Sequence, residues 1–147
     1  MDYTYESKES CNICDENVQN APIIPGYMLD KDFNGVLLYT PESSINIFNT
    51  VLADCSQLKG QIVNKQMTST KFKIKAFFKS SYENGIDICI VFKFYTLVQE
   101  DICITVMHME KRSGDPFEFH RLYLTFNERF HVYSNSQLQL QPEKKQK

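Results

Sequence analysis

The chain has 147 residues, of which 42% are hydrophobic and 13% aromatic, and its formal net charge is −2. This length suits one domain with a sizeable core, and no apolar run approaches the roughly 20 residues that span a bilayer. The polar, acidic start resembles neither a secretory signal nor a transit peptide. Together with five widely spaced cysteines, these features favour a reduced, cytoplasmic or nuclear protein that is not transmembrane.

Three segments are expected along the chain. Residues 1–39 lie in an acid-rich part of the sequence, lack periodicity up to the turn-forming stretch APIIPG, and are predicted to form an acidic, poorly structured extension. Residues 40–133 are predicted to form the compact domain. The polar tail, residues 134–147, is predicted to be flexible.

A helix is predicted over residues 40–60, TPESSINIFNTVLADCSQLKG. Thr40 can cap its start, Pro41 fits the first helical position, and Gly60 stands where a C-terminal stop belongs. The apolar residues between them recur at helical spacing and are expected to face a core: Ile45, Phe48, Val51, Leu52, Cys55 and Leu58.

Strands are predicted to follow this helix. Residues 71–78 alternate apolar side chains with lysines, which is the period of a strand with one wet face. A second strand is expected over residues 86–94 after the turn SYENG, and a third over residues 102–110 after the turn VQED. In the third strand Met107 and Met109 break the alternation, and a β-bulge is one explanation. Short turns between successive strands predict an antiparallel meander.

The stretch SGDP, residues 113–116, predicts a sharp strand-to-helix corner. Gly114 permits the backbone angle of such a turn, Asp115 can cap the helix, and Glu118 completes a capping box. An apolar stripe at helical spacing continues from there: Phe119, Leu122, Tyr123, Phe126 and Phe130. We therefore predict an α+β fold, a small antiparallel β-meander of three to four strands with two helices packed on one face.

Lysines are concentrated in one part of the chain, since residues 55–82 contain six lysines and no acid. Lys71, Lys73 and Lys75 are expected to project from one face of a strand about 7 Å apart, a spacing at which they can meet several phosphates. Such a run raises the local potential and favours anionic partners. The alternative is that these lysines only keep the sheet face soluble.

No catalytic, metal or cofactor site is expected. Cys11 and Cys14 form half of a metal or redox motif, but the remaining cysteines are single. His108, His120 and His131 have no accompanying nucleophile signature. The sequence therefore predicts a protein that is not an enzyme.

The order of a helix, a meander, a Gly-Asp corner and an aromatic helix resembles kinase-associated domain 1. This domain occurs at the C-termini of checkpoint, microtubule-affinity-regulating and related kinases. The resemblance is carried by MHMEKRSGDPFEFHRLY, residues 107–123, and by TSTKFKIKAFF and GIDICIVFKFYTLVQEDICI upstream. These segments are most similar to the checkpoint-kinase branch, and the likeness covers about residues 40–130.

The resemblance implies a binding and regulatory module. Such domains associate with anionic phospholipid surfaces or fold back on a kinase domain, and a related fold binds RNA in some nucleotidyltransferases. Lys111, Arg112 and Arg121 match the basic residues of the family's corner. The sequence has no glycine-rich phosphate loop, HRD or DFG motif of a kinase domain, so the chain is expected to be either a free-standing domain or one piece of a longer protein. A free-standing domain would put inhibition in cis in doubt.

We therefore expect a regulatory adaptor that docks on a protein partner, with a protein kinase as one candidate, or on an anionic phospholipid surface. A structural subunit of a larger intracellular assembly is the alternative. An RNA-binding module is less favoured because aromatic residues on the wet face are sparse, with Phe77 the main candidate. The basic residues expected to make the contact are Lys71, Lys73, Lys75, Lys111, Arg112, Arg121 and Arg129.

Overall fold

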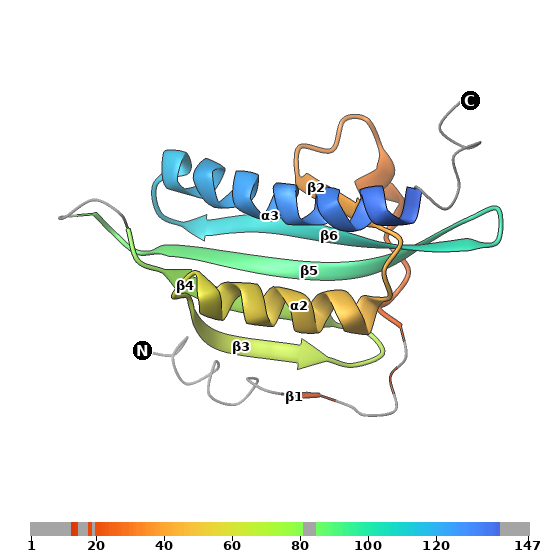
Figure 1. Cartoon of the computed structure of the whole chain (residues 1–147), viewed down its shortest axis with the longest axis horizontal. Coiled ribbons are helices and arrows are strands. Elements are labelled where there is room, and N and C mark those ends of the chain that lie inside the picture. The colour runs from red at the N-terminus through yellow and green to blue at the C-terminus, as the bar shows by residue number, and fades with distance from the viewer. Residues whose placement is uncertain (1–12, 15–17, 19, 81–84, 139–147) are drawn as a thin grey trace.

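The fold consists of one sheet with two helices packed on one face, and both helices run alongside the strands (Figure 1). The computed structural model describes residues 13–14, 18, 20–80 and 85–138. Five antiparallel strands lie in the order β3-β4-β5-β6-β2, and the two-residue strand β1 pairs in parallel with β3. The elements are β1 (Ile13–Cys14), the 3-10 helix η1 (Gly26–Leu29), β2 (Val36–Thr40), α2 (Ser44–Gln57), β3 (Gln61–Met67), β4 (Phe72–Phe78), β5 (Ile88–Gln99), β6 (Ile102–Ser113) and α3 (Pro116–Leu138).

The predicted α+β class, with an antiparallel sheet and two helices, is confirmed, but three to four strands are too few. Sequence reasoning missed β2 and β3. In β3 the polar residues Asn64 and Gln66 pair with Lys75 and Lys73, so this strand lacks the apolar alternation that would have marked it. β2 falls inside the segment that was expected to be poorly structured.

The segment boundaries differ from the prediction at both ends of the domain. Within residues 1–39, β2 pairs with β6, and the side chains of Ala21, Ile24 and Met28 are buried. The expectation of a poorly structured extension is therefore wrong for this part of it. At the other end α3 continues to Leu138, inside the predicted tail. Residues 1–12 and 139–147 lie outside the described part of the chain, so the expectations for them stay predictions.

Helix α2 is capped by other residues than those predicted. The hydroxyl of Ser43 accepts a hydrogen bond at 3.2 Å from a backbone N–H of the first turn, whereas Thr40 is the buried end of β2. At the other end Lys59 takes the left-handed conformation, with φ of 63°, and the N–H of Gly60 donates to the carbonyl of Cys55 at 2.7 Å. The helix therefore ends in a Schellman-type turn with a lysine in the position that usually favours glycine.

The main core lies between the sheet and the two helices. Phe48 of α2 contacts the rings of Phe72 and Phe94, with centroids 5.8 and 5.6 Å apart, and Phe92 meets Phe126 of α3 at 5.0 Å. Both helices thus turn their predicted apolar stripes toward one face of the sheet. The predicted stripe residues that are fully buried there are Phe48, Val51, Cys55, Leu122, Phe126 and Phe130.

A smaller core lies on the opposite face, under residues 20–35. This segment passes the edge of β5 beside Thr96, whose N–H donates to the carbonyl of Pro22 at 2.7 Å and whose carbonyl accepts from the N–H of Ile24 at 2.9 Å. Ile24 and Met28 then pack in a cluster that includes Val106 of β6. Residues 20–35 therefore cover one part of the helix-free face and leave the rest of it open.

Strand β6 is buried on both of its faces at this level, which explains the broken alternation in the sequence. Met107 and Met109 belong to the core on the helix side, whereas Val106 belongs to the smaller core opposite. The register between β5 and β6 is regular through these residues and shifts only next to Cys89. The bulge that the sequence suggested at the methionines is therefore absent.

The strand-to-helix corner forms as predicted. Gly114 has φ of 111°, and a Cβ atom at this position would lie 2.8 Å from the Cα of Ile88, so only glycine fits without strain. The carboxylate of Asp115 accepts a hydrogen bond from the N–H of Glu118 at 3.1 Å and caps α3. Among the described residues no helix, α3 included, is both long and apolar enough to cross a bilayer.

Candidate anion-binding site

Basic side chains gather on the open part of the sheet face that carries no helix. Because residues alternate along β4, Lys73 and Lys75 point away from the helices while the residues between them are buried in the core. Lys93 of β5 lies directly opposite Lys73 in the ladder and shares its face. Two further cations lie close enough to Lys73 to repel its charge. We call this set the basic sheet face: Lys71, Lys73, Lys75, Lys93 and Arg112.

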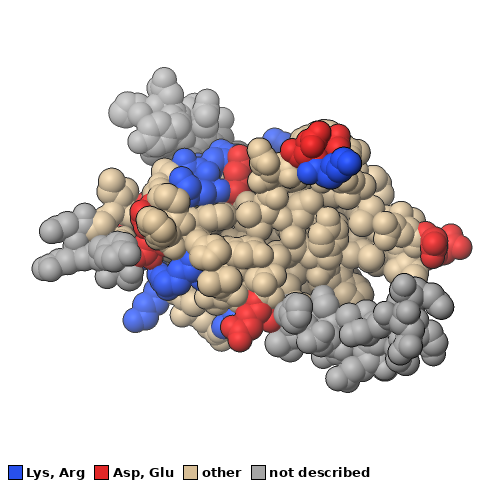
Figure 2. Space-filling view, turned by 90° about the horizontal axis from the view of Figure 1, so that it is seen from above, with Lys and Arg blue, Asp and Glu red and all other residues tan. Residues whose placement is uncertain are grey.

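Charge is separated along the length of the molecule. Figure 2 shows most Lys and Arg side chains of this view toward one end, with acidic side chains between them, whereas the opposite tip carries acidic side chains alone. That tip is the turn of the β5–β6 hairpin, where Glu100 and Asp101 are exposed (Figure 1). The small net charge of the chain therefore conceals a strong local surplus of positive charge.

The predicted contact residues divide between the two faces of the sheet. Lys71, Lys73, Lys75 and Arg112 belong to the basic sheet face. The other three basic residues lie on the helix side. Lys111 stands opposite Ile90, a residue of the main core. Arg121 and Arg129 are on α3, where their guanidinium groups lie 2.7 Å from the carboxylate of Glu118 and 3.0 Å from that of Asp54 of α2. The seven predicted residues therefore do not form one surface.

Lys93 is the member of the basic sheet face that sequence reasoning missed. It lies in the apolar run ICIVFKFYTLV, where it reads as an interruption of a buried strand. The signal that could have found it is register, because a hairpin folded about residue 83, the middle of the SYENG turn, places residue 93 opposite residue 73. The ladder between β4 and β5 has this register.

The electrostatics of the face are dominated by repulsion between its cations. Burial lowers the pKa of Lys73, and the charges of the other four members of the face lower it further. Burial alone would raise the pKa of Glu110, but Lys93 and Arg112 outweigh it and the pKa is lowered. These two cations lie 3.3 and 3.4 Å from the Glu110 carboxylate. One carboxylate thus offsets part of the charge of five cations, and a surplus remains.

A pocket of about 280 Å³ opens on this face. The ladder between β4 and β5 ends at the pair Lys73–Lys93, and beyond it residues 22–24 take over the edge of β5 at Thr96. The pocket lies between the end of the β4 pairing and the start of the pairing of β5 with residues 22–24. It is lined by Pro22, Thr70, Lys71, Phe72, Lys73, Lys93, Phe94 and Tyr95.

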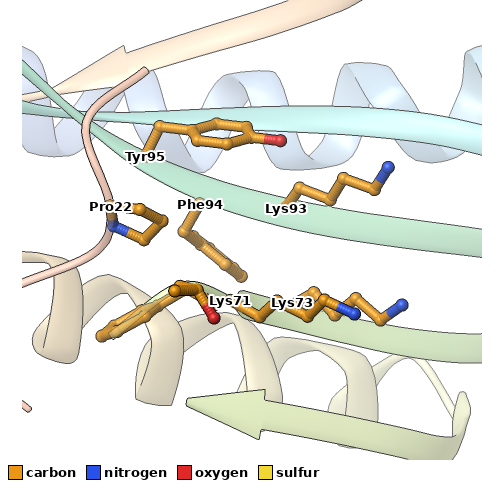
Figure 3. A pocket seen from close by; sticks show the side chains of 8 residues that line it. Pro22, Lys71, Lys73, Lys93, Phe94 and Tyr95 are labelled. Atoms are coloured by element: carbon orange, nitrogen blue, oxygen red, sulfur yellow. The ribbon is translucent and has the colours of Figure 1, made fainter. Parts of the chain in front are cut away.

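The polar groups that line the pocket lie on one side of it. Figure 3 shows the amino groups of Lys71, Lys73 and Lys93 and the hydroxyl of Tyr95 on the side away from Pro22, with Lys93 above Lys71 and Lys73. Three ammonium groups and one hydroxyl are all hydrogen-bond donors. This arrangement suits an anion and disfavours a cation.

The remaining candidate groups of the sequence do not form a second site among the described residues. His108 packs on Phe33 with ring centroids 5.4 Å apart, and its pKa is lowered, chiefly by burial. Burial, with the Asp54 charge beside it, raises the pKa of Cys55 to about 12, which keeps this thiol protonated at neutral pH. In the described ranges no three His, Cys, Asp or Glu side chains stand together as metal ligands, and Cys11 lies outside those ranges.

Comparison of the chain with protein-family models, with curated proteins and with solved structures gave no match. The function is therefore inferred from the basic sheet face, its pocket and the sequence.

Proposed function

We propose that the chain is a non-enzymatic adaptor that docks on a protein partner through the basic sheet face. The observation that carries this proposal is the gathering of five cations, with one carboxylate among them, on a part of the helix-free sheet face that lies outside the smaller core under residues 20–35. Such a surplus attracts an acidic surface over several ångströms and accelerates its association.

The surroundings of the face favour a protein surface as the occupant. Residues 20–35 stand beside the open part of the sheet, so the basic residues lie next to a raised border and not on a flat plane. Tyr27 on this border is 69% exposed, and Tyr95 on the sheet is half-buried. Protein interfaces are enriched in tyrosine and arginine at their centres, and both residue types occur here.

The resemblance of residues 107–123 to kinase-associated domain 1 supports the same class of function. Domains of that family act as regulatory modules on proteins or membranes. On this proposal the chain has the same kind of fold, and a protein kinase acting in trans is one candidate partner. These 147 residues contain no kinase motifs.

One observation favours a second candidate, docking on an anionic phospholipid surface. Ile86 and Phe117 are 76% and 77% exposed, and both lie at the Gly114 corner, because Gly114 contacts Ile88. Lys79 and Lys111 are exposed at the same end of the sheet. Apolar side chains beside lysines are the combination that inserts into a lipid interface.

Charge reversal tests the first candidate. Lys71→Glu/Lys73→Glu changes the basic sheet face, and Lys31→Glu/Lys59→Glu is the matched control, since it changes the net charge equally at exposed lysines elsewhere. Proteins that co-purify with the full chain from its native cells are expected to be lost with the first variant and kept with the second. Equal recovery with both variants would contradict the proposal.

Co-sedimentation tests the second candidate. Vesicles with phosphatidylserine are compared with neutral vesicles at two salt concentrations, with the corner variant Ile86→Ser/Phe117→Ser. Binding that requires anionic lipid, falls with salt and is lost in the corner variant would favour the membrane. Absence of such binding would eliminate it.

A further inference from the structure

The pocket on the basic sheet face has more positive charge than the protein itself neutralises. Of its three lysines, only Lys93 has a carboxylate partner within salt-bridge distance in the described part of the chain. Lys71 and Lys73 face the same space without one, although each ammonium can donate three hydrogen bonds. A ligand that brings negative charge into this space would relieve repulsion that the folded chain otherwise bears.

The pocket is small. Its volume of about 280 Å³ lies at the lower edge of the range of roughly 300–1,000 Å³ that is typical of small-molecule sites. Pro22 closes one side and the lysine amino groups stand on the other (Figure 3). One charged substituent, carried on a larger surface that stays outside, fits this shape.

We propose that this pocket receives the phosphate of a phosphorylated serine, threonine or tyrosine side chain on the docking partner, which deepens the proposed function and rests on it. A phosphate monoester carries a charge between −1.5 and −2 near neutral pH and has three acceptor oxygens. Three ammonium groups and the Tyr95 hydroxyl can meet those oxygens together. A carboxylate has one charge and two oxygens, and it would leave donors of the pocket unpaired.

The neighbours of the pocket favour a phosphorylated protein segment over a lipid headgroup. Pro22 lines the pocket, Ile23 beside it is exposed, and Tyr27 lies close enough to Tyr95 to affect its pKa. These apolar and aromatic side chains can pack on residues that flank a phosphorylated one. The exposed corner that suits a membrane lies beyond Ile88, which is about 17 Å from Lys93 along β5. A headgroup in the pocket would therefore not itself contact that corner.

The burial of Lys73 agrees with this role. Its pKa is lowered by burial and by the neighbouring cations. The negative charge of a bound dianion would outweigh the repulsion from the neighbouring cations. Occupation of the pocket is therefore expected to raise the pKa of Lys73.

The test uses the full chain and immobilised degenerate peptides with one fixed central residue. Three libraries differ only in that residue: phosphoserine, serine or glutamate. We expect the phosphoserine library to bind about tenfold more tightly than the glutamate library, the effect typical of one added charge-assisted hydrogen bond. Phosphothreonine and phosphotyrosine libraries are measured in the same way, and preference for any one of the three supports the proposal.

Four variants separate the pocket from the rest of the basic sheet face. Lys73→Gln and Lys93→Gln each remove one pocket ammonium, and Tyr95→Phe removes only the hydroxyl; each is expected to reduce the preference for phosphate. Lys75→Gln is the matched control, because Lys75 belongs to the basic sheet face but does not line the pocket. It is expected to weaken all libraries to a similar degree and to leave the ratio unchanged. Thermal unfolding checks that each variant folds, and Tyr95→Phe keeps the test valid if a lysine variant does not.

Three outcomes would overturn the inference. In the first, phosphorylated and glutamate libraries bind equally, while the charge-reversal test still shows docking; the proposed function then stands without a phosphate site. In the second, Lys75→Gln lowers the preference as much as Lys73→Gln, which assigns the effect to the face in general. In the third, vesicles with phosphatidylinositol phosphates bind and Lys73→Gln abolishes this binding, but no peptide library discriminates; a lipid headgroup is then the ligand.

Discussion

The two faces of the sheet are built on the same strands and yet differ in burial and charge. On the helix side, alternate residues of β4 and β5 are aromatic or aliphatic and fully buried under α2 and α3. On the other side, the intervening residues of the same strands include Lys73, Lys75 and Lys93. The period of two lets one stretch of chain supply a core and a charged surface at once.

This comparison teaches that core packing and surface charge can be separated by the alternation of residues along a strand. Ile74 and Phe92 stand opposite each other in the core, and one position along each strand Lys73 and Lys93 stand opposite each other outside it. Like charges directly opposite are unfavourable in a sheet. Packing of the core residues on the helix side holds the strands in this register despite the repulsion between the two lysines. The charge on the other side is left without enough carboxylates to balance it.

The largest expected effect comes from the helix side. Phe126→Ala removes a fully buried ring that packs on Phe92, and the free energy of unfolding should fall by about 3–5 kcal/mol. Chemical denaturation followed by circular dichroism measures this change. Leu124→Ala, at a half-exposed position of the same helix, is the control and should change stability little. Similar losses in both variants would mean that α3 does not pack as described.

A second prediction tests the segment that covers part of the opposite face. Met28→Ala should cost about 2 kcal/mol, because this side chain is buried in the smaller core. Leu29→Ala, at an exposed neighbouring position, should have a small effect. Denaturation midpoints compare the two variants. An unchanged midpoint in Met28→Ala would return residues 20–35 to the poorly structured extension that the sequence predicts.

A third prediction concerns the ion pair between the two helices. Arg129→Gln should cost about 2 kcal/mol at pH 7, because it leaves the buried carboxylate of Asp54 without its cation. Burial raises the pKa of Asp54 and the Arg129 charge opposes the rise, so the pKa rises further in the variant. A group with a raised folded-state pKa binds its proton more tightly when folded, and stability falls as the pH rises from the unfolded pKa to the folded one.

The loss in Arg129→Gln should therefore shrink as the pH is lowered from 7 toward about 4, the unfolded-state pKa of an aspartate, because the raised pKa of Asp54 lets the folded variant take up the proton before that pH is reached. Melting temperatures of both proteins across this range measure the effect. Asp54→Asn/Arg129→Gln has no carboxylate to titrate and serves as the control. A deficit that is equal at both ends of the range would contradict the role given to this pair.

Lys73→Gln is expected to change stability least, in contrast to Phe126→Ala. Its free energy of unfolding should stay within about 0.5 kcal/mol of the parent, since the ammonium lies on the open face and is repelled by its neighbours. Anion binding should fall at the same time. Thermal unfolding and the peptide-library assay give the two readouts, and a large loss of stability would show that this lysine belongs to the core.

The sequence predicts the elements whose pattern is local. The corner at Gly114 and the stripe of α3 follow from glycine, capping and helical spacing, and the alternation of β4 follows from its lysines. The two missed strands have weaker local signals. β3 carries Asn64 and Gln66 where apolar residues would mark a strand. β2 is a short apolar run between Gly35 and Pro41, whose type is ambiguous from the sequence until its pairing with β6 is known.

The candidate site could likewise be predicted only where its residues are close together in the sequence. Lys71, Lys73 and Lys75 stand close together in the sequence, so the strand period predicts their common face. Lys93 joins them through a hairpin register, and Pro22 reaches the pocket only because residues 20–24 pass the edge of β5. Contacts between residues far apart in the chain depend on the whole fold, and no window of the sequence contains them.

The passage of residues 20–24 across the edge of β5 has a practical consequence for work with this protein. Ala21 lies in the core under the helices, Ile24 lies in the core on the reverse side, and Pro22 between them lines the pocket. A fragment that begins at residue 40 would lose residues 20–24, which contribute a buried side chain to each core, and would lose Pro22 from the lining of the pocket. Biochemistry on such a trimmed version would report a weakened scaffold and a widened pocket, so expression should start upstream of residue 18.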